Sequence, residues 1–334
     1  MLDSATLYYR AFHALPTTMT APDGTPNNAV RGFFDALASL VTRLQPTHLV
    51  CAWDADWRPQ FRVDLWPGYK THRLAPNDTG DTDDTDTVAE QAPDDLAPQV
   101  DVIARVLDEL GICRIGVAGF EADDVIATIC LGANKAKDIP VDAAADMAVG
   151  MPVDIVTSDR DLLQCVDDAR GVRLVSIARG LKNLTIFDEA AVRDRYGIRP
   201  QQYVDFATLR GDPSDGLPGV PGVGEKTAAA LIRDFGSLAA VMHAAAHGGG
   251  PESPDRPTPA SMKPSVRTRI RAVSDTLEPL ARVSTAVTEV PLPPQWQRAA
   301  VLPSAAPSQA ADICVAHGVS RQRTALATAG VIPH

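Results

Sequence analysis

The sequence predicts an α/β fold in which helices flank a mostly parallel sheet and a helical unit follows it. In the first half of the 334-residue chain, short apolar runs alternate with helical patterns, as expected of parallel strands joined by helices. The apolar runs stop near residue 188, and helical patterns continue beyond it. Acidic residues directly follow several of the runs, and the carboxyl ends of parallel strands meet at one edge of a sheet. These three observations define the expected architecture.

The predicted strands are four short apolar runs, at residues 47–53, 113–117, 153–157 and 172–175. The helices predicted between them span residues 28–44, 96–110 and 122–131. In the second of these helices, Val100, Ile103 and Leu107 recur at helical spacing and give it one apolar face. Four further helices are predicted in the helical unit, at residues 188–196, 200–209, 225–235 and 265–283.

The chain divides into an α/β part (1–187), a helical part (188–290) and a C-terminal tail (291–334). An acidic insertion at 76–95 is rich in Asp and Thr, and it cannot bury enough apolar surface to offset the entropy of ordering. Residues 244–264 contain three consecutive glycines and five prolines, so a flexible loop is expected there. The tail is rich in Ala and Pro and predicts no defined element.

Composition excludes several classes of protein. No apolar run of about 18 residues is present, so no transmembrane helix is expected, and the N-terminus lacks the features of a signal peptide. The five cysteines are widely spaced, with no Cys-x-x-Cys pair, which argues against a disulfide framework or a thiolate zinc site and fits a reducing compartment. We therefore expect a soluble, cytoplasmic protein with no membrane association.

The net charge of −11 does not exclude a polyanionic partner. Eight acids and no base lie between residues 76 and 95. When these acids and nine acids of a predicted metal site are set aside, bases outnumber the acids that remain. The rest of the chain is therefore basic, and nucleic acid stays open as a partner.

Nine acids follow predicted strands or lie in a Gly/Pro-rich turn, where the fold would bring them together. They are Asp3, Asp54, Glu121, Asp123, Asp124, Asp159, Asp161, Asp212 and Asp215. So many carboxylates cannot stay ionised together unless cations neutralise them, and oxygen ligands without His or Cys select Mg²⁺ or Mn²⁺. Two such ions about 3.5–4 Å apart activate a water and stabilise the leaving oxygen of a phosphodiester. A single Asp after a strand is equally well a turn residue or a helix cap, but the whole set indicates a metal site.

A Gly-rich segment, residues 219–227, joins two predicted helices of the helical part. Its glycines permit a tight hairpin that a polyanion can approach closely, and the N–H groups at the start of the second helix would face phosphate oxygens. Lys226 adds a charge that fixes register without reading sequence. A bare Gly-x-Gly turn would be unremarkable in a helical protein, but the whole string resembles the helix–hairpin–helix motif of DNA repair and replication proteins.

Taken together, these segments resemble the 5′→3′ exonuclease and flap endonuclease family, in particular the 5′-nuclease domain of bacterial DNA polymerase I or its stand-alone counterpart. The resemblance covers roughly residues 1–290 and includes Glu-Ala-Asp-Asp at 121–124 and Ser-Asp-Arg-Asp at 158–161. The segments that carry it are residues 2–12, 53–62, 69–73, 121–124, 157–164 and 211–227. The implied fold is a PIN-like (resolvase-like) nuclease domain with a helix–hairpin–helix subdomain.

The resemblance also implies roles for the matching residues. One metal ion is assigned chiefly to Asp3, Asp54, Glu121, Asp123 and Asp124, and a second to Asp159, Asp161, Asp212 and Asp215. Lys70 and Arg73, at the base of the family's arch, would contact the scissile phosphate and act in catalysis with Asp3, Asp54, Asp124 and Asp159. Contacts to DNA are implied for Arg10, Arg62, Tyr69, Lys70, Arg73, Gly222, Gly224, Lys226 and Thr227, although for Tyr69 local packing is the simpler expectation.

The implied reaction is Mg²⁺-dependent hydrolysis of DNA at junctions between single strand and duplex, in replication and repair. The implied substrates are 5′ flaps, nicked or gapped duplexes and RNA-primer ends, recognised by shape. Mn²⁺ is expected to substitute for Mg²⁺, and a K⁺ ion is implied at the hairpin. A DNA polymerase is a candidate partner, and a monomer is the default expectation.

Three features depart from the family pattern, and the smallest is Asp56, which stands where the family usually has a small or basic residue and is expected to be a solvated loop acid. Family members carry several apolar residues before the first aspartate, forming a central strand, whereas only Met1 and Leu2 precede Asp3 here. Either this strand is truncated or the start lies upstream, and a truncated strand is expected to hold Asp3 less firmly than the other acids. The acidic insertion falls in the family's arch, where its charge would repel DNA, and a disordered, outward-pointing segment is expected.

Three other functions fit part of the pattern. A ribonuclease of the related acid-cluster fold would have similar metal chemistry, but the hairpin and Lys226 favour duplex DNA. A non-catalytic junction binder would be expected to lack cluster acids, and all nine are present. A phosphatase acting on small molecules would not need the hairpin.

Overall fold

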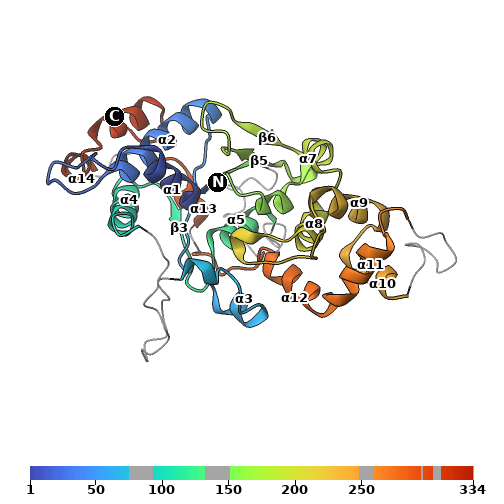
Figure 1. The fold of residues 1–334 in the computed structure, drawn as a ribbon. Helices are drawn as coiled ribbons and strands as arrows, with labels where there is room; N and C mark the ends of the chain where they lie inside the picture. The colour runs from blue at the N-terminus through green and yellow to red at the C-terminus, as the bar shows by residue number, and fades with distance from the viewer. Residues whose placement is uncertain (75–92, 132–150, 248–258, 295, 304–309, 334) are drawn as a thin grey trace.

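The structure, a computed structural model, describes residues 1–74, 93–131, 151–247, 259–294, 296–303 and 310–333. Figure 1 shows a sheet flanked by helices, with a group of further helices extending to one side of it. Most of the acidic insertion lies outside the described residues, as do the predictions that it is disordered and points outward.

Six strands form one sheet in the spatial order β3-β2-β1-β4-β5-β6. The strands are β1 (Leu2–Asp3), β2 (Cys51–Ala52), β3 (Arg114–Ile115), β4 (Val153–Thr157), β5 (Val172–Ser176) and β6 (Thr185–Phe187). The first five pair in parallel, and β6 is antiparallel to β5. The predicted mostly parallel sheet is confirmed, and β6 adds an edge strand too short to give a clear sequence pattern.

The central strand, β1, contains only two residues. The terminal amino group of Met1 extends its pairing by donating to the Asp154 carbonyl at 3.0 Å, and the Val156 N–H donates to the Met1 carbonyl at 2.9 Å. Burial lowers the pKa of this amino group. A short central strand is thus present, and it places Asp3 at the C-terminal edge of the sheet.

Helices cover both faces of the sheet. The helices of the α/β part are α1 (Ser4–Ala14), α2 (Asn28–Leu44), α3 (Gln60–Leu65), α4 (Ala97–Glu109) and α5 (Ala122–Leu131). Alternate strand residues serve two cores: Cys51 and Val156 pack with α1, α2 and α4, whereas Ala52 and Ile155 pack with α5 and the helical part. The loop that joins β3 to α5 therefore lies at the C-terminal edge of the sheet, where the acids were predicted.

The helical part contains six helices among the described residues. They are α7 (Glu189–Tyr196), α8 (Tyr203–Arg210), α9 (Glu225–Phe235), α10 (Leu238–His247), α11 (Pro264–Ala272) and α12 (Ser274–Ser284). Helix α8 packs against both α9 and α12. This arrangement places the turn that leads out of α8 next to the sheet edge.

Two predictions in the helical part are wrong in detail. Residues 244–247 of the predicted loop at 244–264 belong to α10, because Ala244 and Ala245 are buried against the helical core, and residues 248–258 lie outside the described residues. The single helix predicted at 265–283 is two helices, α11 and α12, which meet at Val273. Hydrophobic spacing is maintained across that junction, which is why the sequence did not reveal the break.

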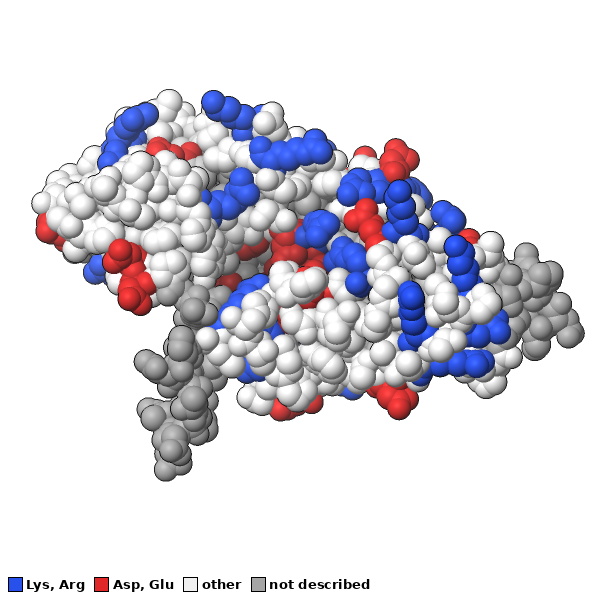
Figure 2. All heavy atoms as spheres, in the orientation of Figure 1, with Lys and Arg blue, Asp and Glu red and all other residues white. Residues whose placement is uncertain are grey.

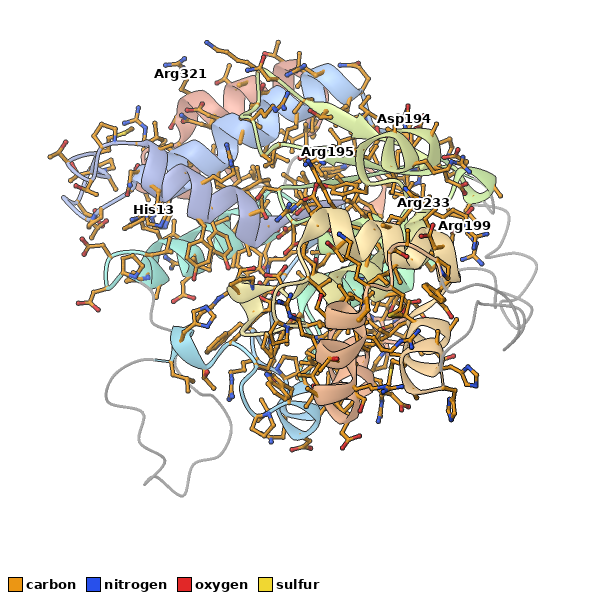
Figure 3. The ribbon with its side chains drawn as sticks, turned by 45° about the vertical axis from the view of Figure 1, so that its right-hand side comes forward. His13, Asp194, Arg195, Arg199, Arg233 and Arg321 are labelled. Carbon is orange, nitrogen blue, oxygen red and sulfur yellow. The ribbon has the colours of Figure 1, made fainter. Side chains whose placement is uncertain are left out.

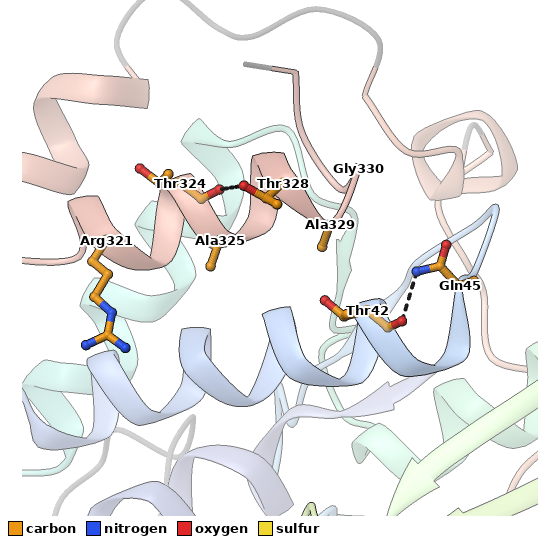
Figure 4. A pocket seen from close by; sticks show the side chains of 8 residues that line it. All are labelled: Thr42, Gln45, Arg321, Thr324, Ala325, Thr328, Ala329 and Gly330. Carbon is orange, nitrogen blue, oxygen red and sulfur yellow. Dashed lines mark hydrogen bonds between the residues drawn. The ribbon is translucent and has the colours of Figure 1, made fainter.

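The C-terminal tail is ordered in its described residues, although its sequence predicted no element. It forms α13 (Trp296–Ala300), α14 (Ala310–Ala316) and α15 (Ser320–Thr328). Helix α15 lies along α2, and Leu326 of α15 and Ile332 beyond its end are buried in the core around α1, α2 and α4. An open groove of about 650 Å³ lies between the C-terminal half of α2 and α15, and the residues that line it include Thr42, Gln45, Arg321 and Ala325 (Figure 4).

None of the helices in the described parts of the chain is long and apolar enough to cross a bilayer.

Candidate active site

Eight of the nine predicted acids lie together at the C-terminal edge of the sheet, where their charges interact. They are Asp3, Asp54, Glu121, Asp123, Asp159, Asp161, Asp212 and Asp215. Figure 2 shows acidic side chains gathered in a hollow of the molecular surface, with Lys and Arg side chains around it. We refer to these eight residues as the acid cluster.

Backbone and hydroxyl donors hold two of these carboxylates in place. Asp3 caps α1, accepting from the Thr6 N–H at 3.1 Å, and its other oxygen accepts from the hydroxyls of Thr6 at 2.5 Å and Thr157 at 2.6 Å. Asp54, which follows β2, accepts from the Ala122 N–H at 2.7 Å. Both side chains are therefore fixed relative to the sheet before any ligand binds.

The crowding of acids changes their protonation. Loss of hydration, reinforced by Glu121, raises the pKa of Asp54 to about 7. Loss of hydration, reinforced by the charges of Asp215 and Asp3, raises the pKa of Asp159 to about 6. The pKa of Asp123 is also raised well above its usual value, by loss of hydration and then by Asp159. A site with this excess of negative charge favours a bound cation.

The second half of the acid cluster comes from the segment that follows β4 and from the turn after α8. Loss of hydration and the neighbouring charge of Asp159 raise the pKa of Asp161, and its buried Oδ1 has no hydrogen-bond partner in the described structure. Asp212 caps the short 3₁₀ helix Pro213–Asp215 by accepting from the Ser214 N–H at 2.9 Å. Asp215 accepts from Arg73 at 3.2 Å.

The donor set of the acid cluster fits a hard divalent cation. It consists of carboxylate oxygens, it carries a large negative charge, and one buried oxygen of Asp161 lacks a partner among the described residues. Among those residues, no three acidic, His or Cys side chains already surround one point as a finished coordination sphere. Basic side chains instead lie against some of the carboxylates.

Lys70 is one of these basic side chains. Its Nζ donates to Glu121 at 2.9 Å and to the Trp57 carbonyl at 3.2 Å. Burial alone would lower the pKa of Lys70, but Glu121, Asp215 and other nearby acids raise it well above its usual value, so the ammonium persists. Its φ of 50° is uncommon for a residue other than glycine, as found at functional sites.

The segment that carries Lys70 is clamped onto the turn after α8. The Lys70 N–H donates to the Asp215 carbonyl at 3.0 Å, and Trp66 Nε1 donates to the Gly216 carbonyl at 3.1 Å. A Cβ on Gly216 would lie 2.5 Å from the Gly68 carbonyl oxygen, so only glycine permits this close approach. Arg73 completes the clamp by donating to the Ser214 carbonyl at 2.7 Å.

Three predicted contacts are not supported by the side-chain positions. Asp124 does not face the acid cluster, because both of its oxygens accept from Arg62, at 2.7 and 2.8 Å. Arg62, predicted to contact phosphate, is only 3% exposed. Tyr69 is buried as well and donates to both oxygens of Glu121, at 2.9 and 3.0 Å, which agrees with packing rather than base stacking.

The helix–hairpin–helix segment runs from α8 to α9. Gly222 has a φ of 71°, and a Cβ there would lie 2.4 Å from Nη1 of Arg269 on α11. Gly224 directly precedes α9, and a Cβ at this residue would meet open space. Lys226 is exposed in the first turn of α9, with Thr227 beside it. The first N–H groups of a helix have no partner within the helix and can bind an anion.

Arg10, the remaining residue predicted to contact DNA, is partly exposed on α1. Sequence reasoning missed other residues that build the site, including Thr6, Thr157 and Trp66. It also missed Arg58, whose guanidinium donates to the carbonyls of Tyr69 at 2.6 Å and Pro67 at 3.0 Å. Thr157 and Trp66 act through contacts to residues 154 and 150 positions away along the chain, for which a single sequence carries no signal.

An acid cluster at the C-terminal edge of a parallel sheet, beside a hairpin built for a polyanion, is the arrangement of a nuclease. The chain belongs to the 5′–3′ exonuclease family. Its residues 1–197 match the family's N-terminal resolvase-like domain, and residues 198–306 match the C-terminal SAM fold of the same family.

Relatives named 5′–3′ exonuclease support this membership over nearly the whole chain. The protein of Streptomyces coelicolor is 48% identical over 88% of this chain and 87% of its own length. The protein of Mycobacterium tuberculosis is 45% identical over 87% of this chain and 84% of its own length. A DNA polymerase I of the same species is 40% identical, but the match covers only 23% of that polymerase.

Solved structures agree with the fold. The flap endonuclease of bacteriophage T5, in a complex with DNA and metal ions, is 17% identical with a TM-score of 0.58, and 98% of each chain is covered. The catalytic core of Rad2 with a DNA substrate is 14% identical with a TM-score of 0.55, over 99% of this chain and 90% of that one. The predicted fold, family and nuclease class are therefore confirmed.

Proposed function

We propose that this nuclease is a metal-dependent 5′→3′ exonuclease and 5′ flap endonuclease that hydrolyses DNA at junctions between single strand and duplex. Removal of RNA primers and processing of flaps in the cytoplasm would be its tasks in replication and repair. The observation that carries the proposal is the position of the acid cluster directly beside the helix–hairpin–helix segment. That arrangement brings a phosphodiester held at the hairpin side close to the carboxylates.

Two groups of acids would hold Mg²⁺, with Mn²⁺ as a substitute. One group comprises Asp3, Asp54, Glu121 and Asp123, and the other comprises Asp159, Asp161, Asp212 and Asp215. When bound, such ions activate a water and stabilise the leaving oxygen. The chain's own task is to keep the carboxylates oriented, which the donors from Thr6, Thr157 and Ala122 do for Asp3 and Asp54.

Lys70 and Arg73 would stabilise the negative charge that develops on the phosphate. Both lie on the segment clamped to the turn after α8, and both already contact acids, Glu121 and Asp215. Because the fold already holds these two basic side chains in place, they need little reorganisation when the substrate binds. This is the condition for strong electrostatic stabilisation.

The helical part would bind the duplex. The N–H groups at the start of α9 and the exposed Lys226 would contact phosphates, and a K⁺ ion at the hairpin would add to this. Figure 3 shows Arg195, Arg199 and Arg233 along the same side of the molecule, on and near α7 and α9. These cations would extend the surface that contacts the phosphate backbone of the DNA beyond the hairpin.

The protein is proposed to act as a monomer. A DNA polymerase is the proposed partner, because a related segment forms part of DNA polymerase I in mycobacteria.

Cleavage of a 5′-labelled flap duplex tests the proposal. Product formation is measured with Mg²⁺, with Mn²⁺ and with EDTA, for the wild type and for the double variant Asp159→Ala/Asp161→Ala. The expected result is cutting near the junction that needs a divalent ion and is lost in the double variant. The variant Asp108→Asn, which changes an exposed acid on α4 paired with Arg114, is the matched control.

The same assay separates the alternatives. Cutting of an RNA strand but not of the DNA flap would replace the proposal with a ribonuclease. Binding of the flap in a gel-shift assay without cutting under any of the metal conditions would replace it with a junction-binding protein.

A further inference from the structure

The chain that leaves the helical part crosses back over the elements that carry the acid cluster. We define this segment, residues 283–290, as the strap. It begins with the last two residues of α12 and runs past α3, α5 and the 3₁₀ helix Asp161–Cys165. The strap is thus the point at which the helical part and the metal-ligand elements meet.

Four side chains bind the main chain of the strap. Arg62 Nε donates to the Val283 carbonyl at 3.0 Å. Gln164 donates to the Ser284 carbonyl at 3.1 Å and accepts from the Ala286 N–H at 3.0 Å. These two side chains come from α3 and from the 3₁₀ helix that begins at Asp161.

The other two side chains belong to α5. Asp124 accepts from the Val287 N–H at 2.8 Å, and Thr128 donates to the Val287 carbonyl and accepts from the Val290 N–H, both at 3.1 Å. Helix α5 begins directly after Glu121 and carries Asp123 in its first turn. The strap is therefore fastened to elements that carry acids of both proposed metal groups.

Asp124 has no capacity left for a metal ion. Its Oδ1 accepts from Arg62 at 2.7 Å and from Val287 at 2.8 Å, and its Oδ2 accepts from Arg62 at 2.8 Å and from the Glu121 N–H at 3.2 Å. The side chains of Asp124 and Arg62 are 0% and 3% exposed. Two buried ionised groups are tolerated only when each satisfies the other, as they do here.

The hydrogen bond from the Glu121 N–H to Asp124 indicates what the Asp124–Arg62 ion pair does. The Glu121 carboxylate lies 3.4 Å from the Arg62 guanidinium, and the Glu121 N–H donates to Asp124 at 3.2 Å. We propose that Asp124 and Arg62 are positioning residues, which fasten the strap to α5 and hold Glu121 and Asp123 in place for the metal ions. This inference rests on the proposed function, and it assigns neither a metal ion to Asp124 nor a phosphate to Arg62.

The first test counts metal ions. Binding of Mn²⁺ to the DNA-free protein is measured by titration calorimetry for the wild type, Asp124→Asn and Asp159→Asn. We expect Asp124→Asn to bind the same number of Mn²⁺ ions as the wild type, whereas Asp159→Asn binds fewer. Loss of an ion in Asp124→Asn, as in Asp159→Asn, would overturn the proposal, because Asp124 would then be a ligand.

The second test separates positioning from simple structural support. For Asp124→Asn and Arg62→Lys, kcat and KM on the flap substrate are measured well below the melting temperature. We expect kcat to fall by about 10–100-fold, as for other residues that orient metal ligands, with KM little changed because the hairpin is untouched. Non-additive losses of kcat in the double variant would show that the two residues act as one unit.

A variant with a lower Tm but with kcat equal to that of the control Asp108→Asn would overturn the proposal in favour of a structural role. If Asp124→Asn does not fold, Thr128→Val removes two strap bonds without burying a charge, and it must lower kcat with an unchanged ion count. Failure of the wild type to cut any substrate would remove the proposed function instead, and the ion count of Asp124→Asn would still decide the assignment of Asp124.

Discussion

Asp123 and Asp124 are adjacent in the sequence but belong to different environments. Consecutive residues of a helix point about 100° apart, so Asp123 faces the acid cluster while Asp124 points to Arg62 and the strap. The sequence predicted the group of acids correctly as a local concentration of charge. It could not distinguish the two neighbours, because the partner of Asp124 lies 62 residues away along the chain.

Protonation of the acid cluster gives a prediction for stability. The folded-state pKa of Asp54 is about 7, and that of Asp159 is about 6, against a usual value of 3.8. Because the folded state binds these protons more tightly than the unfolded chain, their contribution to stability is fully present below about pH 4 and is lost as pH rises through 6 to 7. A bound Mg²⁺ ion favours the ionised acids and reverses this loss.

We therefore expect Mg²⁺ to raise the Tm more at pH 8 than at pH 5.5, as measured by differential scanning fluorimetry. The variant Asp54→Asn, which cannot titrate at this position, should show a smaller difference between the two pH values. An equal Mg²⁺ effect at both pH values in the wild type would contradict the prediction.

Lys70 gives a prediction for catalysis. Replacing it with Met in Lys70→Met removes a buried charge that lies 2.9 Å from Glu121. We expect kcat on the flap substrate to fall by about 10²–10³-fold, the usual cost of losing one preorganised donor to a developing charge. Duplex binding in Ca²⁺, measured by fluorescence anisotropy, should change little. Lys182→Met, at an exposed lysine before β6, is the control, and a kcat of Lys70→Met equal to the control would contradict the role.

At the scale of elements, the regular pattern of the α/β part was predictable. The runs at 153–157 and 172–175 became β4 and β5, and the helix predicted at 28–44 is α2. Elements without a long apolar run were not predictable. β6 has three residues, and α10 extends into a stretch whose Ala, Gly and Pro content indicated a loop, because its alanines pack against the helical core.

The helix–hairpin–helix segment gives a prediction for DNA binding. Lys226 is exposed at the start of α9, where it can neutralise one phosphate without contacting a base. Lys226→Ala should weaken duplex binding equally for different sequences and reduce the slope of log K against log salt by about 1. The measurement is anisotropy at several salt concentrations.

Arg321→Ala is the control for this prediction. Figure 3 shows Arg321 on α15, well away from the Arg199 and Arg233 side of the molecule. A sequence-dependent loss of affinity in Lys226→Ala, or the same loss in Arg321→Ala, would contradict the assignment of the hairpin as a non-specific backbone contact.

At the scale of the whole molecule, the tail completes the core. Leu326 on α15 is 0% exposed and packs in the core around α1, α2 and α4. Leu326→Ala should lower the free energy of unfolding by about 2–5 kcal/mol, as measured by urea denaturation, with cleavage at low temperature unchanged because α15 does not contact the acid cluster. Val315→Ala, at a side chain that is 61% exposed on α14, should change neither. A Leu326→Ala variant as stable as this control would contradict the role of the tail.

The position of β1 also determines the order in which the molecule can form. β1 pairs with β2 and with β4, so its second neighbour lies about 150 residues away along the chain. Contacts of such large sequence separation make folding slow, and the core around α1 and α2 stays incomplete until α15 has been synthesised. During translation, the strand that carries Asp3 therefore lacks its sheet partner β4 until about 150 further residues have emerged from the ribosome. A nascent chain of this kind has no complete acid cluster until the turn that carries Asp212 and Asp215 has been synthesised, so phosphodiester cutting cannot begin before that point.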